Sequence, residues 1–121
     1  MFKGYKDRVE LLLVYIREAH PSDGWQMPAN EKDGVVFKEP KSLIERKTIA
    51  ETTCKKLNLS LPTVIDDMEN TVDNQYAGWP ERMFIVDATG KIAYAGKQGP
   101  FGFKPPEVTA WLEKNVGAAK K

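Results

Sequence analysis

The stretch that decides the fold is Leu-Leu-Leu-Val-Tyr-Ile-Arg-Glu-Ala-His-Pro-Ser-Asp-Gly-Trp, residues 11–25. Its first part, residues 11–16, is apolar on both faces, which indicates a central strand covered on both sides. We expect this strand to span residues 9–16 and to deliver Glu18 and His20 to the following loop. In α/β sheets, the loops at the carboxyl ends of the strands commonly carry the chemistry. The segment therefore predicts a class of fold and the place of a functional site.

Residues 41–57 form the clearest helix in the sequence. Ser42 and Glu45 stand three residues apart and predict a capping box, in which each side chain accepts from a free backbone N–H at the helix start. Asn58 favours the end of this helix. The apolar face of the helix is formed by Leu43, Ala50, Cys54 and Leu57. We expect Cys54 to be an inert core thiol on that face.

Three further strands are predicted at residues 62–66, 82–86 and 91–95. The last two are joined by Asp-Ala-Thr-Gly, a turn signal that indicates a β-hairpin and gives Gly90 a positive φ. Pro106 begins the last helix. The apolar stripe of that helix is formed by Val108, Trp111, Leu112 and Val116.

The predicted elements follow in the order strand, helix, strand, hairpin and helix, with a loop or a short helix at residues 67–78. A βα crossover followed by a hairpin gives a mixed sheet with helices on its faces. We therefore predict an α/β fold with a mixed sheet of about four strands. This order resembles the body of a thioredoxin-like fold in which the first βα unit is incomplete or missing.

Length and composition bound the possible functions. The 121 residues fit one domain, residues 1–121, in which we expect residues 118–121 to form a disordered tail. The net charge of +1, with mixed signs along the chain, argues against nucleic acid as a partner. The longest apolar run, residues 11–16, is too short to span a membrane, and no signal-peptide pattern is found. We therefore expect a cytoplasmic location and no membrane partner.

Cysteine usage excludes several kinds of site. Cys54 is the single cysteine, so the chain has no internal disulfide and no Cys-x-x-Cys motif. The sequence also lacks the Cys and His spacing of a zinc cluster. We expect neither a metal site nor a cofactor.

Two titratable residues stand close together after the first strand. His20, the single histidine, can hold or release a proton near neutral pH, or it can bind a backbone carbonyl without a further role. Glu18 lies two residues earlier and shares a face with His20 if the segment is extended. A carboxylate beside an imidazole fixes its tautomer and raises its pKa. The alternative for Glu18 is a solvated side chain at a strand end.

Three blocks of sequence resemble the iodothyronine deiodinase family. The first is residues 6–25, which contain Tyr-Ile-Arg-Glu-Ala-His-Pro-Ser-Asp-Gly-Trp. The second is Tyr-Ala-Gly-Trp-Pro-Glu-Arg at residues 76–82. The third is Gly-Lys-Gln-Gly-Pro-Phe at residues 96–101, followed by a helix that begins with Pro-Glu-Val. The resemblance covers roughly residues 5–116.

The resemblance implies a thioredoxin-fold reductase and assigns roles to individual residues. Members of the family carry a selenocysteine or cysteine nucleophile after the first strand, at the start of the first helix. We expect this sequence to lack that strand and nucleophile, and Cys54 lies on a different helix. By resemblance, Glu18, His20 and Tyr76 would form the catalytic group that supplies a proton. The alternative for Tyr76 is a packed loop aromatic.

Four residues are candidates for binding substrate. Ser22 is a possible relay hydroxyl, although Pro-Ser-Asp-Gly also predicts a plain turn. Trp25 lies in the matched motif and would orient the loop or stack on a ligand. Glu81 and Arg82 precede a strand that faces the nucleophile in thioredoxin-like folds, and Arg82 would hold an anionic group or pair with Glu81 or Glu18. Pro80 is one residue from the usual cis-proline position, so we expect a cis bond there.

These observations support three hypotheses. The first is a deiodinase-like oxidoreductase that acts on a small aromatic or halogenated substrate, with a peroxide or disulfide as alternatives. The second is a module that binds a ligand or a protein without turnover. The third is an assembly role, because a missing first strand exposes a sheet edge that invites pairing. We therefore expect a homodimer or a larger homo-oligomer.

Overall fold

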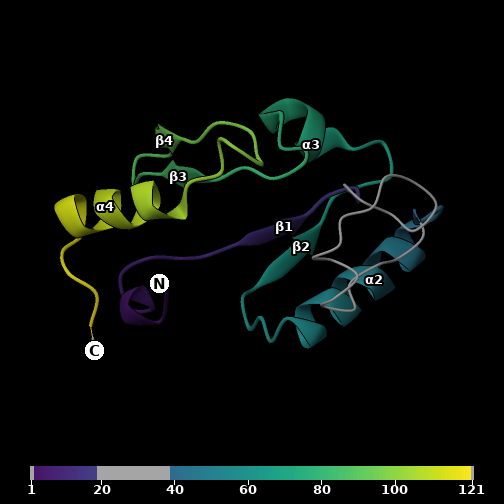
Figure 1. Cartoon of the computed structure of the whole chain (residues 1–121), viewed down its shortest axis with the longest axis horizontal. Coiled ribbons are helices and arrows are strands. Elements are labelled where there is room, and N and C mark those ends of the chain that lie inside the picture. Colours follow the sequence, from purple (N-terminus) through teal and green to yellow (C-terminus); the bar gives the residue numbers. More distant parts are fainter. Residues whose placement is uncertain (1, 19–38, 121) are drawn as a thin grey trace. The chain divides into compact units, whose positions relative to one another are not determined.

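The computed structural model describes residues 2–18 and 39–120 (Figure 1). Their elements follow in the order η1, β1, α2, β2, α3, β3, β4 and α4. The chain divides into two compact units. One is Leu12–Trp79, and the other combines Met1–Leu11 with Pro80–Lys121. They are named here the β1–β2 unit and the β3–β4 unit, after the strands that each contains.

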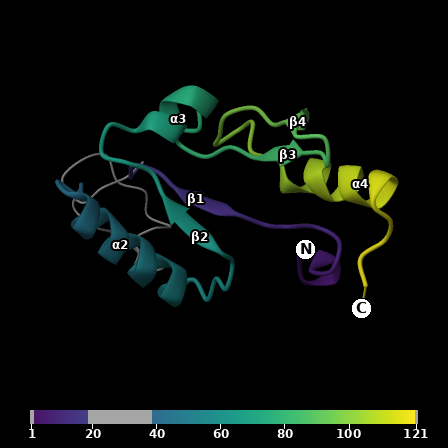
Figure 2. The same ribbon diagram turned by 180° about the vertical axis from the view of Figure 1, so that it is seen from behind.

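The β1–β2 unit is built on a parallel pair of strands. β1 (Leu13–Tyr15) pairs with β2 (Thr63–Ile65) in the parallel direction. Parallel neighbours need a crossover connection, and α2 (Leu43–Lys56) lies in that connection, beside the strands in both views (Figures 1 and 2). α3 (Thr71–Tyr76) follows β2. The carboxyl ends of both strands therefore lie at one edge of this sheet.

The start of α2 confirms the predicted capping box. The Glu45 backbone N–H donates to Ser42 Oγ at 3.1 Å, and the Glu45 carboxylate accepts from the backbone N–H of Lys41 at 2.7 Å. The Glu45 side chain thus reaches one residue beyond the N-cap, Ser42. The helix ends as predicted, because Asn58 has a φ of 55°, the left-handed conformation that stops a helix.

The expected burial of α2 is partly wrong. Leu43 and Leu57 are 50% and 42% exposed, whereas the buried residues are Arg46 and Ala50. Apolar periodicity missed Arg46 because its guanidinium enters the interior to reach backbone carbonyls beyond β2. Leu43 is the first residue of α2 and Leu57 is its C-cap, so both leucines lie at the ends of the helix although they share a face with Ala50. Cys54 is half-buried, so its expected place in the core is also wrong.

The β3–β4 unit contains the predicted hairpin. β3 (Phe84–Val86) and β4 (Ile92–Ala95) pair in the antiparallel direction. The turn is held by Asp87, whose Oδ1 accepts from the backbone N–H of Thr89 and of the residue that follows Gly90. Gly90 has a φ of 85°, which a residue with a Cβ adopts only with strain, so the turn prediction is confirmed.

α4 (Pro105–Asn115) covers this hairpin and closes the apolar core of the β3–β4 unit. The core consists of Tyr5, Val108 and Leu112, with Val9, Met83, Ile85, Tyr94, Trp111 and Val116 packed against it. Tyr5 ends the short η1 helix (Phe2–Tyr5), and its hydroxyl donates to the carbonyl of Gly117 at 2.9 Å. The two ends of the chain are thus joined within one unit.

The predicted fold class is confirmed. The structure is α/β, with four described strands that form one parallel pair and one antiparallel pair, and it is compatible with a thioredoxin-like fold. Each described strand is shorter than its predicted range. The predicted cis bond before Pro80 is wrong, because Gly99–Pro100 is the cis peptide bond of the described residues. In the same part of the chain, no helix has the length and hydropathy to cross a bilayer.

Candidate functional site

The best-defined candidate group is the Glu18 carboxyl, just beyond the end of β1. Arg17 occupies a bend directly after the strand, and Glu18 is half-buried. The Tyr15 hydroxyl donates a hydrogen bond to Glu18 Oε1. Residues three apart in an extended strand point to opposite faces, so this contact depends on the bend at Arg17.

The surroundings of Glu18 favour its protonated form. Burial raises the pKa of the Glu18 carboxyl from its usual 4.5 to about 7, and the Glu39 carboxylate adds to this rise. The Arg46 guanidinium opposes it. A carboxyl with a pKa near neutrality can both donate and accept a proton under physiological conditions, which suits general acid–base chemistry.

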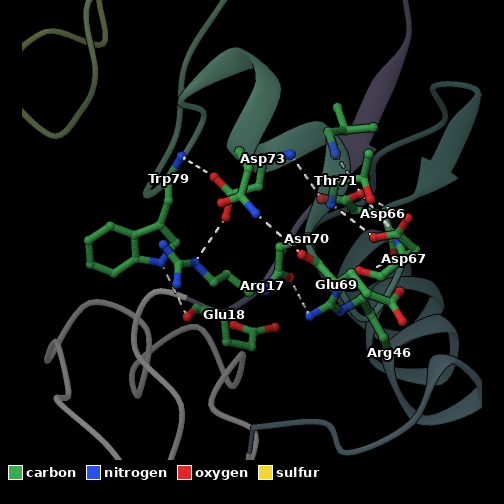
Figure 3. A network of polar contacts seen from close by, with 12 residues as sticks. Arg17, Glu18, Arg46, Asp66, Asp67, Glu69, Asn70, Thr71, Asp73 and Trp79 are labelled. Carbon is green, nitrogen blue, oxygen red and sulfur yellow. Dashed lines mark hydrogen bonds and ion pairs between the residues drawn. The ribbon is translucent and has the colours of Figure 1, made fainter.

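Three residues interact next to Glu18: Asp73, Arg17 and Trp79 (Figure 3). They are named here the Asp73 cluster. Asp73 lies in α3 and is 3% exposed. Its Oδ1 accepts from the Trp79 backbone N–H at 2.9 Å. Its Oδ2 lies 2.9 Å from Arg17 Nε, in an ion pair without the alignment of a hydrogen bond.

The Asp73 cluster closes back on the end of β1. The Arg17 guanidinium lies over the Trp79 ring, 5.1 Å from its centroid, in a cation–π contact. The Trp79 indole N–H donates to the Glu18 backbone carbonyl at 3.4 Å. Arg17 is therefore held through its side chain and Glu18 through its backbone, both by groups that follow β2 in the sequence.

Asp66, directly after β2, is a second buried carboxylate of the β1–β2 unit. It is 2% exposed, and its two carboxylate oxygens accept from the backbone N–H groups of Asp67, Val72 and Asp73 at 2.9–3.0 Å. The N–H groups of Val72 and Asp73 lie in the first turn of α3, where a carboxylate is favoured by the free donors and the helix dipole. Asp66 thus fixes the position of α3, and with it Asp73.

Arg46 links α2 to the segment between β2 and α3 (Figure 3). It is 1% exposed, and its guanidinium donates to the carbonyls of Asp66 at 3.3 Å and Asp67 at 2.6 Å, and to Asn70 Oδ1 at 3.1 Å. Its Nε has no hydrogen-bond partner within the described part of the chain. The buried cation is thus engaged by backbone dipoles and an amide.

The structure places the other predicted site residues in different regions. His20, Ser22 and Trp25 lie outside the described residues. Tyr76 is the last residue of α3, and its side chain is 42% exposed. Of the predicted catalytic group, Glu18 and Tyr76 both belong to the β1–β2 unit.

Glu81 and Arg82 belong to the β3–β4 unit and contact the loop that follows β4. Arg82 Nε donates to the Gly96 carbonyl at 2.5 Å, and its guanidinium lies 4.7 Å from the centroid of the Phe84 ring. The Glu81 side chain lies so close to Gly99 that a Cβ there would fall 2.2 Å from Glu81 Oε1. A larger residue at position 99 would therefore require the Glu81 side chain to move.

Sequence reasoning identified Glu18 but missed Tyr15, Arg17 and Asp73. Tyr15 belongs to the apolar run of β1, and its hydroxyl is the one feature that could have indicated a polar partner. Arg17 and Asp73 are opposite charges far apart in the sequence, so their pairing depends on the fold. The hydrogen bond from Trp79 to the Glu18 backbone was not predicted either, because the sequence indicates only an aromatic residue in a loop.

Cys54 lies in a separate place, an open groove between α2 and β2 with a volume of about 460 Å³. Its Sγ is 3.9 Å from Thr63 Oγ1. The groove is lined by both apolar and charged residues, which are Lys47, Ala50, Glu51, Cys54, Lys55, Leu59, Thr63 and Ile65. No group of three or more His, Cys, Asp or Glu side chains that could hold a metal ion occurs among residues 2–18 and 39–120.

Fold and site together define an α/β protein, compatible with a thioredoxin-like fold, that carries a carboxyl of raised pKa just beyond the end of a parallel strand. The iodothyronine deiodinase family model matches residues 1–116. The chain therefore belongs to the iodothyronine deiodinase family.

Individual relatives agree with this assignment. The chain is 40% identical to type I iodothyronine deiodinase of Xenopus laevis over 105 residues, which are 87% of this chain and 39% of the relative. It is 39% identical to the type II enzyme of Rattus norvegicus over 88% of this chain and 40% of the relative. For the type II enzyme of Homo sapiens the identity is 38%, over 93% and 41%. The chain thus spans about two fifths of the length of these relatives.

Proposed function

We propose that this chain provides the proton-donating side of a deiodinase-like oxidoreductase that removes a halogen from a small aromatic substrate. The observation that carries the proposal is the Glu18 carboxyl, whose pKa of about 7 equips it to deliver a proton and whose position is held by the Tyr15 hydroxyl. Membership of the deiodinase family supports the class of reaction. His20 and Tyr76 complete the donor group in this proposal, and Ser22, Trp25, Glu81 and Arg82 contact the substrate.

The proposed reaction needs a proton for each halogen removed. A thiolate or selenolate attacks the halogen and forms a sulfur–halogen or selenium–halogen bond. The carbon–halogen bond breaks, its electron pair stays on carbon, and that carbon takes the proton from the Glu18 group. Two thiol groups of a reductant then reduce the chalcogen–halogen bond, so that halide leaves, the thiolate or selenolate is regenerated and the two thiols form a disulfide. An iodinated phenol ring is the substrate class that the family assignment favours.

We further propose that the nucleophile is not Cys54. This cysteine is the one thiol in residues 1–121, and it lies half-buried in the groove between α2 and β2. Reactive thiols are favoured by a helix N-terminus or an adjacent base. Cys54 instead stands near the end of α2, three residues before the C-cap Leu57. The nucleophile would then come from a segment or a partner outside these residues.

The proposal is tested by supplying the nucleophile as a small selenol, such as selenocysteamine, together with 4-iodophenol and excess dithiothreitol. The chain should accelerate iodide release above the rate with selenol alone, and Glu18→Gln should abolish most of this acceleration. Glu113→Gln is the matched control, because Glu113 is exposed on α4. Equal iodide release by wild type and Glu18→Gln would refute the role of Glu18. Cys54→Ser should keep the acceleration, and its loss would refute the proposal that Cys54 is not the nucleophile.

The alternative is a binding or assembly role without turnover. Apolar strand residues are exposed in both units, at 46% for Val64, 56% for Val86 and 54% for Ile92, which favours pairing with another chain. Light scattering at high micromolar concentration should then show a dimer or a larger species, whereas a clean monomer counts against assembly. A shift of the Glu18 resonances on addition of 4-iodophenol, with no iodide released, would favour the binding module.

A further inference from the structure

Two arginines lie near Glu18, yet both are engaged elsewhere. Arg17 is adjacent in the sequence, but its Nε is 2.9 Å from Asp73 Oδ2 and its guanidinium lies over Trp79. Arg46 donates to two backbone carbonyls and to Asn70. Among the described residues, no ion pair to Glu18 is formed. In the described part of the chain, Glu18 therefore forms an ion pair with neither arginine.

We propose that Asp73 is a positioning residue, whose buried carboxylate holds the Arg17 guanidinium against Trp79 and so keeps it from pairing with Glu18. This inference rests on the proposed function, in which Glu18 donates a proton. A carboxyl that pairs with arginine releases its proton more readily and is ionised at neutral pH. Asp73 thus preserves the protonated donor although it does not contact the substrate.

Burial explains why Asp73 is suited to this task. At 3% exposure its carboxylate is shielded from solvent, and the Trp79 N–H fixes one oxygen so that the other faces Arg17. An ion pair in such surroundings is stronger than one at the surface. Arg17 is 44% exposed, so its guanidinium has room to turn once Asp73 releases it.

The charged and titratable groups that face Glu18 come from several elements. Tyr15 of β1 donates to its carboxyl, Glu39 before α2 repels its charge, and Arg46 of α2 attracts it. Arg17, which follows β1, does not contribute to the raised pKa of Glu18 while Asp73 holds it. Release of Arg17 is therefore the change through which loss of Asp73 would act.

The test is a titration of the Glu18 side-chain carboxyl by carbon-detected NMR on the whole chain, in wild type and four variants. Asp73→Asn keeps an acceptor for the backbone N–H of Trp79 but removes the negative charge that holds the Arg17 guanidinium. The Glu18 midpoint should fall by about one to three pH units, the effect of an opposite charge placed within about 4–6 Å. In Arg17→Gln the midpoint should stay within about half a pH unit of wild type, because Arg17 is already withdrawn.

The double variant Arg17→Gln/Asp73→Asn decides between positioning and mere structural damage. If Asp73 acts by holding Arg17, removal of Arg17 as well should return the Glu18 midpoint to the wild-type value. Damage to the fold would not be rescued in this way. Glu69→Gln is the control, since it removes a negative charge from an exposed residue near the start of α3. It should leave the midpoint unchanged.

The outcomes separate this inference from the proposed function. A midpoint that does not fall in Asp73→Asn, or that stays low in the double variant, overturns the inference even if Glu18→Gln still abolishes iodide release. A midpoint that falls and is rescued supports the inference. If Glu18→Gln then still releases iodide at the wild-type rate, the proposed function fails, and the role of Asp73 is limited to the titration of Glu18.

Discussion

Replacing Glu18 by glutamine is expected to stabilise the protein at pH 8 and to leave its stability near pH 4.5 almost unchanged. Glutamine resembles the protonated carboxyl in size and can still accept from the Tyr15 hydroxyl. The substitution therefore removes the ionisation of Glu18 while it keeps most of its packing.

The sign follows from the direction in which the fold changes the pKa. Between pH 4.5 and about 7 the native Glu18 keeps its proton, whereas the unfolded chain has released it. The unfolded state thus binds fewer protons, and the free energy of unfolding falls as the pH rises through this window. Above pH 7 both states are ionised and the full penalty is present. The variant lacks this group, so its stability should not fall over the same window.

The size of the effect has an upper bound. A rise in pKa from 4.5 to about 7 corresponds to about 3 kcal/mol, at about 1.4 kcal/mol for each pH unit. Glu18 is only half-buried, so solvent screens part of this energy, and we expect a difference of about 1–2 kcal/mol at pH 8.

Urea unfolding of the two proteins at half-unit steps from pH 4 to pH 8.5 measures this difference. Asp7, Asp67 and Asp87 have lowered pKa values, so they titrate below the window and act equally on both proteins. The difference between the two free energies of unfolding should be near zero at pH 4.5 and should grow towards pH 8. Two curves that stay parallel across the range would show that Glu18 titrates normally, and the reasoning on its surroundings would fail.

Three substitutions test the packing of the two units by urea unfolding at pH 7. Arg46→Met should lower the free energy of unfolding by about 2–4 kcal/mol because it leaves buried carbonyls without a donor. Lys47→Met, at an exposed position, should change it by less than about 0.5 kcal/mol. Equal losses in the two variants would contradict this. Asp66→Ala should lower the free energy of unfolding by at least about 2 kcal/mol, since it removes three hydrogen bonds, two of them to the first turn of α3, and a loss below about 1 kcal/mol would contradict this. Gly102→Ala would place a Cβ 2.4 Å from a backbone oxygen and should cost about 1–3 kcal/mol, more than Gly90→Ala, which meets no atom within 4 Å and pays only for its positive φ. The reverse order would refute the steric argument.

Local features of the fold could be predicted from the sequence because nearby residues decide them. The capping box of Ser42 and Glu45 and the left-handed Asn58 fixed both ends of α2 to within two residues. The Asp87 to Gly90 turn predicted the hairpin for the same reason, since its hydrogen bonds are made within the turn. The inner face of α2 could not be predicted, because Arg46 is drawn inside by carbonyls that come later in the chain.

The candidate site shows the same division. Glu18 was singled out by its place at the end of a strand, which local pattern reveals. Its raised pKa depends on burial and on Glu39, and neither can be read from the neighbouring letters. The pairing of Arg17 with Asp73 could not be predicted either, because the sequence does not show which charges meet until α3 is placed beside the end of β1.

The β1–β2 unit buries charged side chains, and the desolvation of these charges opposes folding. Buried charges are expensive unless they are well paired, and an apolar replacement of similar size is often as stable. Here Asp66 is bound by backbone N–H groups and Arg46 mainly by backbone carbonyls, so both fix loops rather than each other. These segments lead into α3, which carries Asp73, and in our proposal Asp73 in turn holds Arg17 away from Glu18. An apolar interior could supply stability, but it could not hold a guanidinium away from a carboxyl that, in the proposed function, keeps its proton. On the proposed function, the charged interior is therefore explained by the protonation of Glu18 rather than by the stability of the fold.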